Sequence, residues 1–280
     1  NITLFPGKVD FTALTKNIED FWPSPDGKKI IFKQTDENDW ALKIYDLERE
    51  LKSHLIENKD ISQKFPVDFM NLEWSQDSKE IYLDAAVKEN EQNFVLKLDK
   101  LPLFLTKRVA PPIPPLNIPG SFPVKAETEY KLDTFNDYIF LREGETLYLF
   151  DRNPETFEKI LEGVKDIKIS PNKDKLVIFS ASEIWIFYLT DAPTKKAGEK
   201  LFLLRLSEKI NNVFWLGGND DYLIFNAGDK IKIAEIDDRD RIQTWEIGNF
   251  PSPQIFFNQT DKKLYILSEG NLYSSENLLK

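Results

Sequence analysis

Apolar and polar positions alternate along short segments of this chain, and residues typical of turns separate those segments at a regular spacing. The clearest example runs from Phe21 to Phe32, where Phe-Trp-Pro precedes Ser-Pro-Asp-Gly and Lys-Lys-Ile-Ile-Phe follows it. In this turn Pro25 presets φ, Asp26 can accept hydrogen bonds from nearby backbone, and Gly27 tolerates positive φ. The pattern predicts two antiparallel strands joined by a tight turn.

The same two-strand pattern recurs in weaker form further along the chain. The other copies are residues 71–83, 132–140, 167–179, 213–225 and 255–267. A third alternating strand follows each copy, at 41–46, 93–98, 146–151, 184–188, 230–235 and 271–273, and several copies have a fourth, as at 52–56 and 201–204. Six copies in 280 residues give a period of roughly 47, which is typical of propeller blades. We therefore predict an all-β fold, a six-bladed β-propeller of four-stranded antiparallel blades, with residues 1–280 as a single domain.

The last copy lacks an outer strand of its own, because few residues remain after 271–273. Residues 8–14, in contrast, form an alternating apolar strand that precedes the first copy. An open edge would leave backbone groups unpaired. We expect residues 8–14 to supply the outermost strand of the last blade and so to close the propeller.

The first copy also resembles a known repeat. Residues 22–32, Trp-Pro-Ser-Pro-Asp-Gly-Lys-Lys-Ile-Ile-Phe, followed by Leu-Lys-Ile-Tyr-Asp-Leu at 42–47, are similar to the WD40-like repeat of TolB-type propellers, and Trp-Ser-Gln-Asp at 74–77 is less so. Proteins of this kind include periplasmic and surface binding propellers and the propeller halves of certain peptidases. The resemblance implies the fold and no catalytic residue, because the peptidase chemistry resides in a separate hydrolase domain that this sequence lacks.

Residues 101–130 interrupt the repeats with seven prolines, including Pro-Pro-Ile-Pro-Pro at 111–115. Proline cannot donate to a strand ladder, so we expect an extended, polyproline-like connection between the second and third blades. Apolar residues such as Phe104 and Phe122 favour a connection that packs on the propeller. The alternative is a polyproline ligand for an aromatic groove, which would require exposure.

Groups suited to catalysis or metal binding are few. The chain has no cysteine and a single histidine, His54, which falls in a predicted outer strand and is expected to be structural. No phosphate-binding, dinucleotide-binding or nucleophile-elbow motif occurs, and zinc has no plausible ligand set. We expect no cofactor and no metal site.

Acidic residues cluster at the loops between the second and third strands, and every predicted blade contributes at least one. We treat that loop face as a candidate binding site for a basic segment or a cation, with solvated turns as the alternative. Two tryptophans that follow such loops are candidate stacking platforms, whereas Trp22, Trp74 and Trp215 occupy equivalent repeat positions and are expected to be structural. The candidate binding residues are Asp36, Glu37, Asp39, Trp40, Glu89, Glu91, Glu143, Glu145, Glu183, Trp185, Asp229 and Glu269.

The net charge of −10 argues against nucleic acid, and no apolar run is long enough to insert into a membrane. The absence of cysteine favours an extracytoplasmic location, in the periplasm or at the cell surface, for what we expect to be a piece of a longer chain. We predict a monomeric, non-catalytic binding propeller for a protein or glycan partner. The alternatives are a glycan-active hydrolase or lyase that uses channel-facing carboxylates, and a structural spacer domain.

Overall fold

The computed structural model describes residues 9–36, 39–88, 90–98, 105–107, 122, 128–151, 155–217, 220–236 and 242–279. The chain divides into two compact units, one of Val9–Ile113 with Asn258–Lys280 and the other of Pro114–Phe257. Within the described ranges, the elements are β-strands apart from one short helix, α1 (Asn58–Ile61). No helix in this part of the chain has the length and apolar character that a membrane crossing requires.

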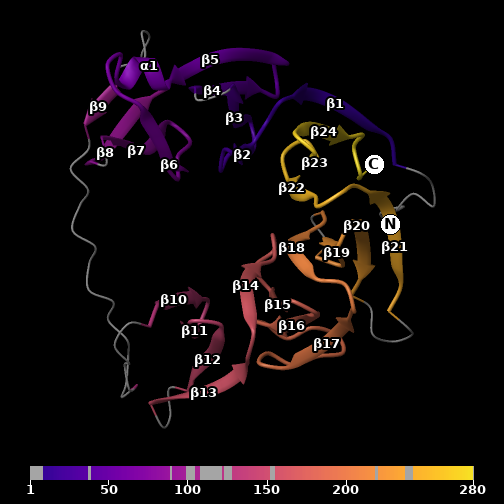
Figure 1. The fold of residues 1–280 in the computed structure, drawn as a ribbon. Helices are drawn as coiled ribbons and strands as arrows, with labels where there is room; N and C mark the ends of the chain where they lie inside the picture. The colour runs from indigo at the N-terminus through magenta and orange to yellow at the C-terminus, as the bar shows by residue number, and fades with distance from the viewer. Residues whose placement is uncertain are drawn as a thin grey trace. The chain divides into compact units, whose positions relative to one another are not determined.

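The strands form six sheets, each of four antiparallel strands (Figure 1). The first unit holds one sheet of β2 (Asp20–Pro23), β3 (Lys29–Asp36), β4 (Asp39–Asp46) and β5 (Leu51–Glu57), and another of β6 (Val67–Trp74), β7 (Glu80–Val87), β8 (Asn90–Lys97) and β9 (Leu105–Lys107). The second unit holds three sheets, the first of which consists of β10 (Tyr130–Phe135), β11 (Tyr138–Glu143), β12 (Thr146–Asp151) and β13 (Thr156–Leu161). The next consists of β14 (Val164–Ile169), β15 (Lys175–Ser180), β16 (Glu183–Tyr188) and β17 (Lys200–Arg205). The third consists of β18 (Ile210–Trp215), β19 (Tyr222–Ala227), β20 (Lys230–Glu235) and β21 (Thr244–Asn249). The last sheet has the order β1 (Phe11–Lys16), β24 (Asn271–Ser275), β23 (Lys263–Ser268), β22 (Gln254–Asn258). The predicted all-β class, with four antiparallel strands per repeat, is confirmed.

The second strand of a sheet is its most buried element. In β15, β19 and β23 every residue after the first is buried. In β15 the alternation of polar and apolar residues is lost because both faces of the strand are covered: Val177 and Phe179 belong to one core cluster, and Leu176 and Ile178 belong to another. In the first unit one such core joins Ile31 and Leu42 to Leu72 and Leu83 of the following sheet.

The N-terminal strand lies at the edge of the last sheet. Phe11 of β1 pairs with Ser275 of β24 and Lys16 pairs with Asn271, and Figure 1 shows the two strands side by side. The strand therefore falls in the sheet that the sequence predicts, although its bounds are Phe11–Lys16 rather than 8–14.

The turn between the first two strands of each sheet contains a residue with positive φ shortly before the second strand begins. Ser24 shows how such a turn is held, because its hydroxyl donates to Asp26 Oδ1 at 2.6 Å and accepts from Lys29 N at 2.9 Å. The residues at this position of the six turns are Gly27, Ser78, Asn136, Lys173, Asp220 and Lys262. Glycine fills the position once, so a shared backbone conformation recurs where the sequence motif does not.

The proline-rich segment contains a strand that the sequence did not predict. Leu105–Lys107 forms β9 and pairs with β8. These three residues include no proline, so their backbone can join the ladder. Phe122 is also described, and its ring lies 5.1 Å from that of Tyr148, which agrees with the expected packing at this point. The other residues of 101–130 lie outside the described part, apart from those that lead into β10.

Candidate functional site

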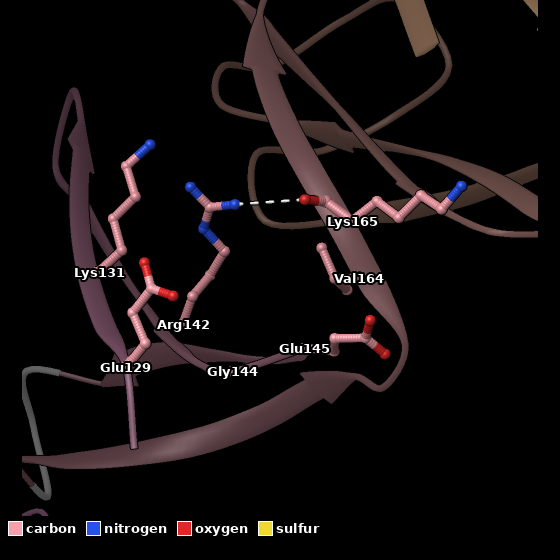
Figure 2. Close-up of a pocket in the computed structure, with 7 residues that line it drawn as sticks. All are labelled: Glu129, Lys131, Arg142, Gly144, Glu145, Val164 and Lys165. Carbon is pink, nitrogen blue, oxygen red and sulfur yellow. Dashed lines mark hydrogen bonds between the residues drawn. The ribbon is translucent and has the colours of Figure 1, made fainter. Parts of the chain in front are cut away.

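A pocket of about 410 Å³ opens in the second unit beside the loop between β11 and β12 (Figure 2). Two backbone hydrogen bonds join the three segments around it. Gly144 N donates to Glu129 O at 2.9 Å, and Val164 N donates to Glu145 O at 2.7 Å. The positive φ of Gly144 (55°) makes the loop tight enough for both bonds to form. The residues that line the pocket are Glu129, Lys131, Arg142, Gly144, Glu145, Val164 and Lys165.

Arg142 holds the centre of this pocket. Its side chain is only 13% exposed and makes ion pairs with Asp133 at 3.5 Å and Asp166 at 3.3 Å. The guanidinium also donates to the carbonyl oxygen of Lys165, the contact drawn in Figure 2. Because Asp133 and Asp166 both face this guanidinium, they are engaged as its counter-charges rather than placed as a free acid and base.

The two lysines of the pocket also have partners. Lys131 lies 3.5 Å from Asp133 Oδ1, and Lys165 Nζ donates to Ile210 O at 2.5 Å. Burial lowers the pKa of Lys165, and repulsion by Lys209 acts in the same direction. The positive charges of the pocket are therefore compensated or disfavoured within the protein.

The two carboxylates of the pocket, unlike its three cations, have no partner among the side chains and backbone groups that the structure describes. Glu129 and Glu145 are exposed, and neither makes an ion pair with a residue that the structure describes. Glu145 belongs to the predicted acidic face, whereas Glu129 was missed. Glu129 and Glu145 are therefore the charged side chains of the pocket that have neither a hydrogen bond nor an ion pair in the described part of the chain.

Three other predicted acids are engaged within their own sheets. Lys59 hydrogen-bonds Asp39 at 2.5 Å and lowers its pKa. Glu143 is 9% exposed and accepts hydrogen bonds from the hydroxyls of Tyr130 and Tyr148 at 2.9 and 3.2 Å. Glu183 has its pKa lowered by hydrogen bonds from the indole of Trp185 and then from Arg205.

The structure corrects the prediction for one of the two candidate stacking tryptophans, Trp40. Trp40 is 5% exposed, its indole N–H donates to Val67 O at 2.8 Å, and its ring meets Phe69 edge to face. It is a core residue because the third strand of the sheet is covered by the next sheet of the unit. Trp185 is partly exposed, with its ring 4.9 Å from that of Phe202.

The remaining predicted residues lie apart from the pocket. Asp36, Glu91, Asp229 and Glu269 are exposed at the loops of four different sheets, and Asp229 accepts from Ser252 N at 2.9 Å. Glu37 and Glu89 lie outside the described residues. The structure thus brings Glu145 together with side chains that the sequence analysis did not select, of which Arg142 carried a signal, a charge within an otherwise apolar strand.

The chemistry of this arrangement favours binding. No group of three or more histidine or acidic residues in the described ranges is placed to hold a metal ion. The pocket combines fixed cations with two exposed carboxylates, Glu129 before β10 and Glu145 between β11 and β12, and its lining contains no nucleophile paired with a base. It can recognise a charged group by electrostatics and hydrogen bonding.

Comparison with solved structures defines the class of protein. The chain resembles one in the mitotic checkpoint complex, with a TM-score of 0.50 and 9% identity over 100% of this chain and 95% of that chain. It also resembles a chain from a study of two prolyl endopeptidases, with a TM-score of 0.52 and 12% identity over 94% of this chain and 50% of that chain. A third likeness, to the Cps50 (Swd1) β-propeller domain of Myceliophteria thermophila, has a TM-score of 0.48 and 11% identity over 97% and 99% of the two chains.

At these identities the likeness concerns the fold. The solved structures that match are β-propellers, and the predicted resemblance to a WD40-like, TolB-type propeller is confirmed at that level. No protein-family model matches the sequence, and the search of curated proteins found no match.

Proposed function

We propose that this protein is a non-catalytic binding module that takes a basic segment of a partner protein at the β11–β12 loop of its second unit. The observation that supports the proposal is the charge balance of the pocket. The heads of Lys131, Arg142 and Lys165 have partners within the protein, whereas Glu129 and Glu145 are exposed and without an ion pair in the described part of the chain. A lysine or arginine side chain of a partner would pair with these two carboxylates.

Such contacts are individually weak. An exposed ion pair contributes roughly 0.2 to 1 kcal/mol and is screened by salt. Binding through Glu129 and Glu145 is therefore expected to need several basic residues in the partner and to weaken as ionic strength rises.

A protein segment fits this site better than a neutral glycan does. Sugar rings are usually held by exposed aromatic faces, and Trp40, one of the two predicted platforms, is buried. A chain of similar fold belongs to the mitotic checkpoint complex, a protein assembly, and this supports a protein partner.

The test is a titration with two peptides of equal length, one rich in lysine and one rich in glutamate. We expect the wild-type protein to bind the lysine-rich peptide more tightly, and the double variant E129Q/E145Q to lose about tenfold in affinity. E158Q is the matched control, because Glu158 is an exposed acid on β13, away from the pocket. Equal binding by wild type and E129Q/E145Q, or a preference for the glutamate-rich peptide, would contradict the proposal.

We also propose that the six sheets are blades of one closed ring, completed by β1, in a monomeric and extracytoplasmic protein. The pairing of β1 with β24 supports the closure, and the absence of cysteine supports the location. Light scattering of the purified protein tests the monomer, and fractionation of the producing cells tests the compartment.

A further inference from the structure

A second pocket, of about 340 Å³, lies in the first unit between the N-terminal strand and the sheet β2–β5. Two hydrogen bonds from the sheet β2–β5 to backbone carbonyls of β1 fix the position of this pocket. Gln34 Nε2 donates to Lys16 O at 2.7 Å, and Lys52 Nζ donates to Leu14 O at 2.5 Å. Apart from the buried Phe32, the lining is polar and consists of Thr15, Gln34, Lys43, Lys52, Ser53 and His54.

The charge of this pocket is opposite to that of the chain. The protein carries a net charge of −10, yet three of the lining residues are basic and none is a carboxylate. His54 Nε2 lies 3.8 Å from Asp60 Oδ2, on the short helix α1. Lys43 makes no ion pair or hydrogen bond with any side chain that the structure describes.

Two of the basic residues face each other across neighbouring strands. A register shift between Leu42 and Lys43 sets Lys43 of β4 opposite His54 of β5. The ladder therefore places no carboxylate opposite the ammonium group of Lys43, and an anion bound between the two strands would supply the missing counter-charge.

Three other sheets contain the same register shift, and they fill the position differently. The opposed residues are Tyr148 and Lys159 in one sheet, Trp185 and Phe202 in the next, and Lys232 and Glu246 in the third. The aromatic pair is in ring contact, and the lysine of the third sheet faces an acid. Among the sheets with this shift, only the sheet β2–β5 opposes two basic groups.

We propose that this pocket binds the phosphate group of a ligand, with Lys43, Lys52 and His54 as the groups that contact it. A phosphate supplies the counter-charge that Lys43 lacks and accepts hydrogen bonds from ammonium and imidazole donors. The neutral side chains of Thr15, Gln34 and Ser53 provide further donors around it. The volume lies at the lower end of the range for small-molecule sites, so the rest of the ligand is small or extends into solvent.

The single histidine makes the test direct, because its ring protons give unique signals in the proton NMR spectrum. At constant ionic strength, titration with inorganic phosphate or glycerol 3-phosphate is expected to shift the His54 signals in a saturable manner. K43Q is expected to weaken this binding by about tenfold. K232Q is the matched control, since Lys232 occupies on β20 the position that Lys43 occupies on β4, opposite Glu246.

A second variant places an acid in the pocket. H54E places an acid opposite Lys43, as Glu246 lies opposite Lys232 in the register of β20 and β21, so it should abolish phosphate binding, measured by calorimetry, without loss of thermal stability. Sedimentation with phosphatidylcholine vesicles, with and without phosphatidic acid, separates a lipid headgroup from a soluble phosphate as the source. Either source supports the site. Phosphate binding that persists unchanged in K43Q and H54E, or no saturable response to any of these probes, would overturn the proposed site. The variant E129Q/E145Q, which changes the pocket of the second unit, should leave phosphate binding unaffected.

Discussion

Asp220 and Ser78 occupy equivalent turn positions in two different sheets, and each accepts a hydrogen bond from the backbone of the preceding sheet's turn. Asp26 N donates to Ser78 Oγ at 3.0 Å, and Asn172 N donates to Asp220 Oδ2 at 3.0 Å. Both acceptors have positive φ, 59° and 53°, and both are buried. The same link between sheets is therefore made once by a neutral hydroxyl and once by a carboxyl group.

The carboxyl group makes stability depend on pH. Burial raises the pKa of Asp220 from 3.8 to about 6, and Asp174 adds to the shift. Because the folded state holds this proton more tightly than the unfolded state, the favourable contribution is complete below pH 3.8 and is lost as pH rises through about 6. D220N removes the charge and keeps an acceptor, so it should raise the free energy of unfolding at pH 7.5 by ~2 kcal/mol and leave it almost unchanged at pH 4.

The comparison needs a control for net charge. D221N makes the same change at the adjacent, exposed position and should not reproduce the effect. Denaturant unfolding at both pH values provides the measurement. A D220N protein that is less stable than wild type at pH 7.5 would show that the carboxylate is the better partner.

Glycine is required at position 27 both because the backbone has positive φ and because neighbouring side chains leave no room for a Cβ atom. A Cβ at this position would overlap Asn258 Oδ1 and lie 2.6 Å from Thr260 Oγ1, and those two side chains hydrogen-bond the carbonyls of Gly27 and Asp26. G27A should therefore cost ~3 kcal/mol, more than backbone strain alone. G163A has the same positive φ with open space around it, so it should cost ~1 kcal/mol in thermal unfolding. Equal losses would mean that the contact is easily relieved.

Two of the repeat tryptophans link one sheet to the next. Trp74 Nε1 donates to Trp22 O, and Trp215 Nε1 donates to Lys168 O, each at 3.0 Å. W215F should cost ~2 kcal/mol, because Trp215 is 4% exposed and its partner carbonyl would stay buried. W74F should cost less, since Trp74 is partly exposed, and W245F, at a 37% exposed side chain, should be close to neutral in the same urea titration.

The N-terminal strand stabilises the last sheet through its backbone more than through its side chains. Most residues of β1 are exposed or half-buried, whereas Val9 and Ile18 on either side of it are buried. Deleting residues 1–16 removes the ladder with β24 and the contact of Val9, and should lower the free energy of unfolding by ~3 kcal/mol. An unchanged melting temperature of the truncated protein would contradict the proposed closure.

The sequence was sufficient to predict the first three strands of each sheet, because alternation and turn residues are local properties, whereas β9 within the proline-rich segment was not predicted. The third strands at 146–151 and 230–235 coincide with β12 and β20. The short helix α1 was not predicted, since four residues carry no helical period. The Ser-Pro-Asp-Gly motif indicated the left-handed residue of one turn only, because a serine or lysine at that position carries no such signal.

The pockets could not be predicted in the same way. Each is assembled from segments that are distant in sequence, as Glu129 and Lys165 illustrate in the second unit. Whether a charge is available also depends on its partners, and these are visible only in the folded chain. Glu183 and Glu145 look alike in the sequence, yet an arginine neutralises the former and the latter is exposed without an ion pair in the described part of the chain.

The antiparallel pairing of β1 with β24 determines how the protein responds to mechanical force. The first residue of β1, Phe11, lies opposite the last residue of β24, Ser275, so both strands leave the ladder at the same end. Tension applied between the two ends of the chain would then load the backbone hydrogen bonds one at a time, as in opening a zipper, rather than all together in shear. The last sheet is therefore where a stretched molecule begins to open.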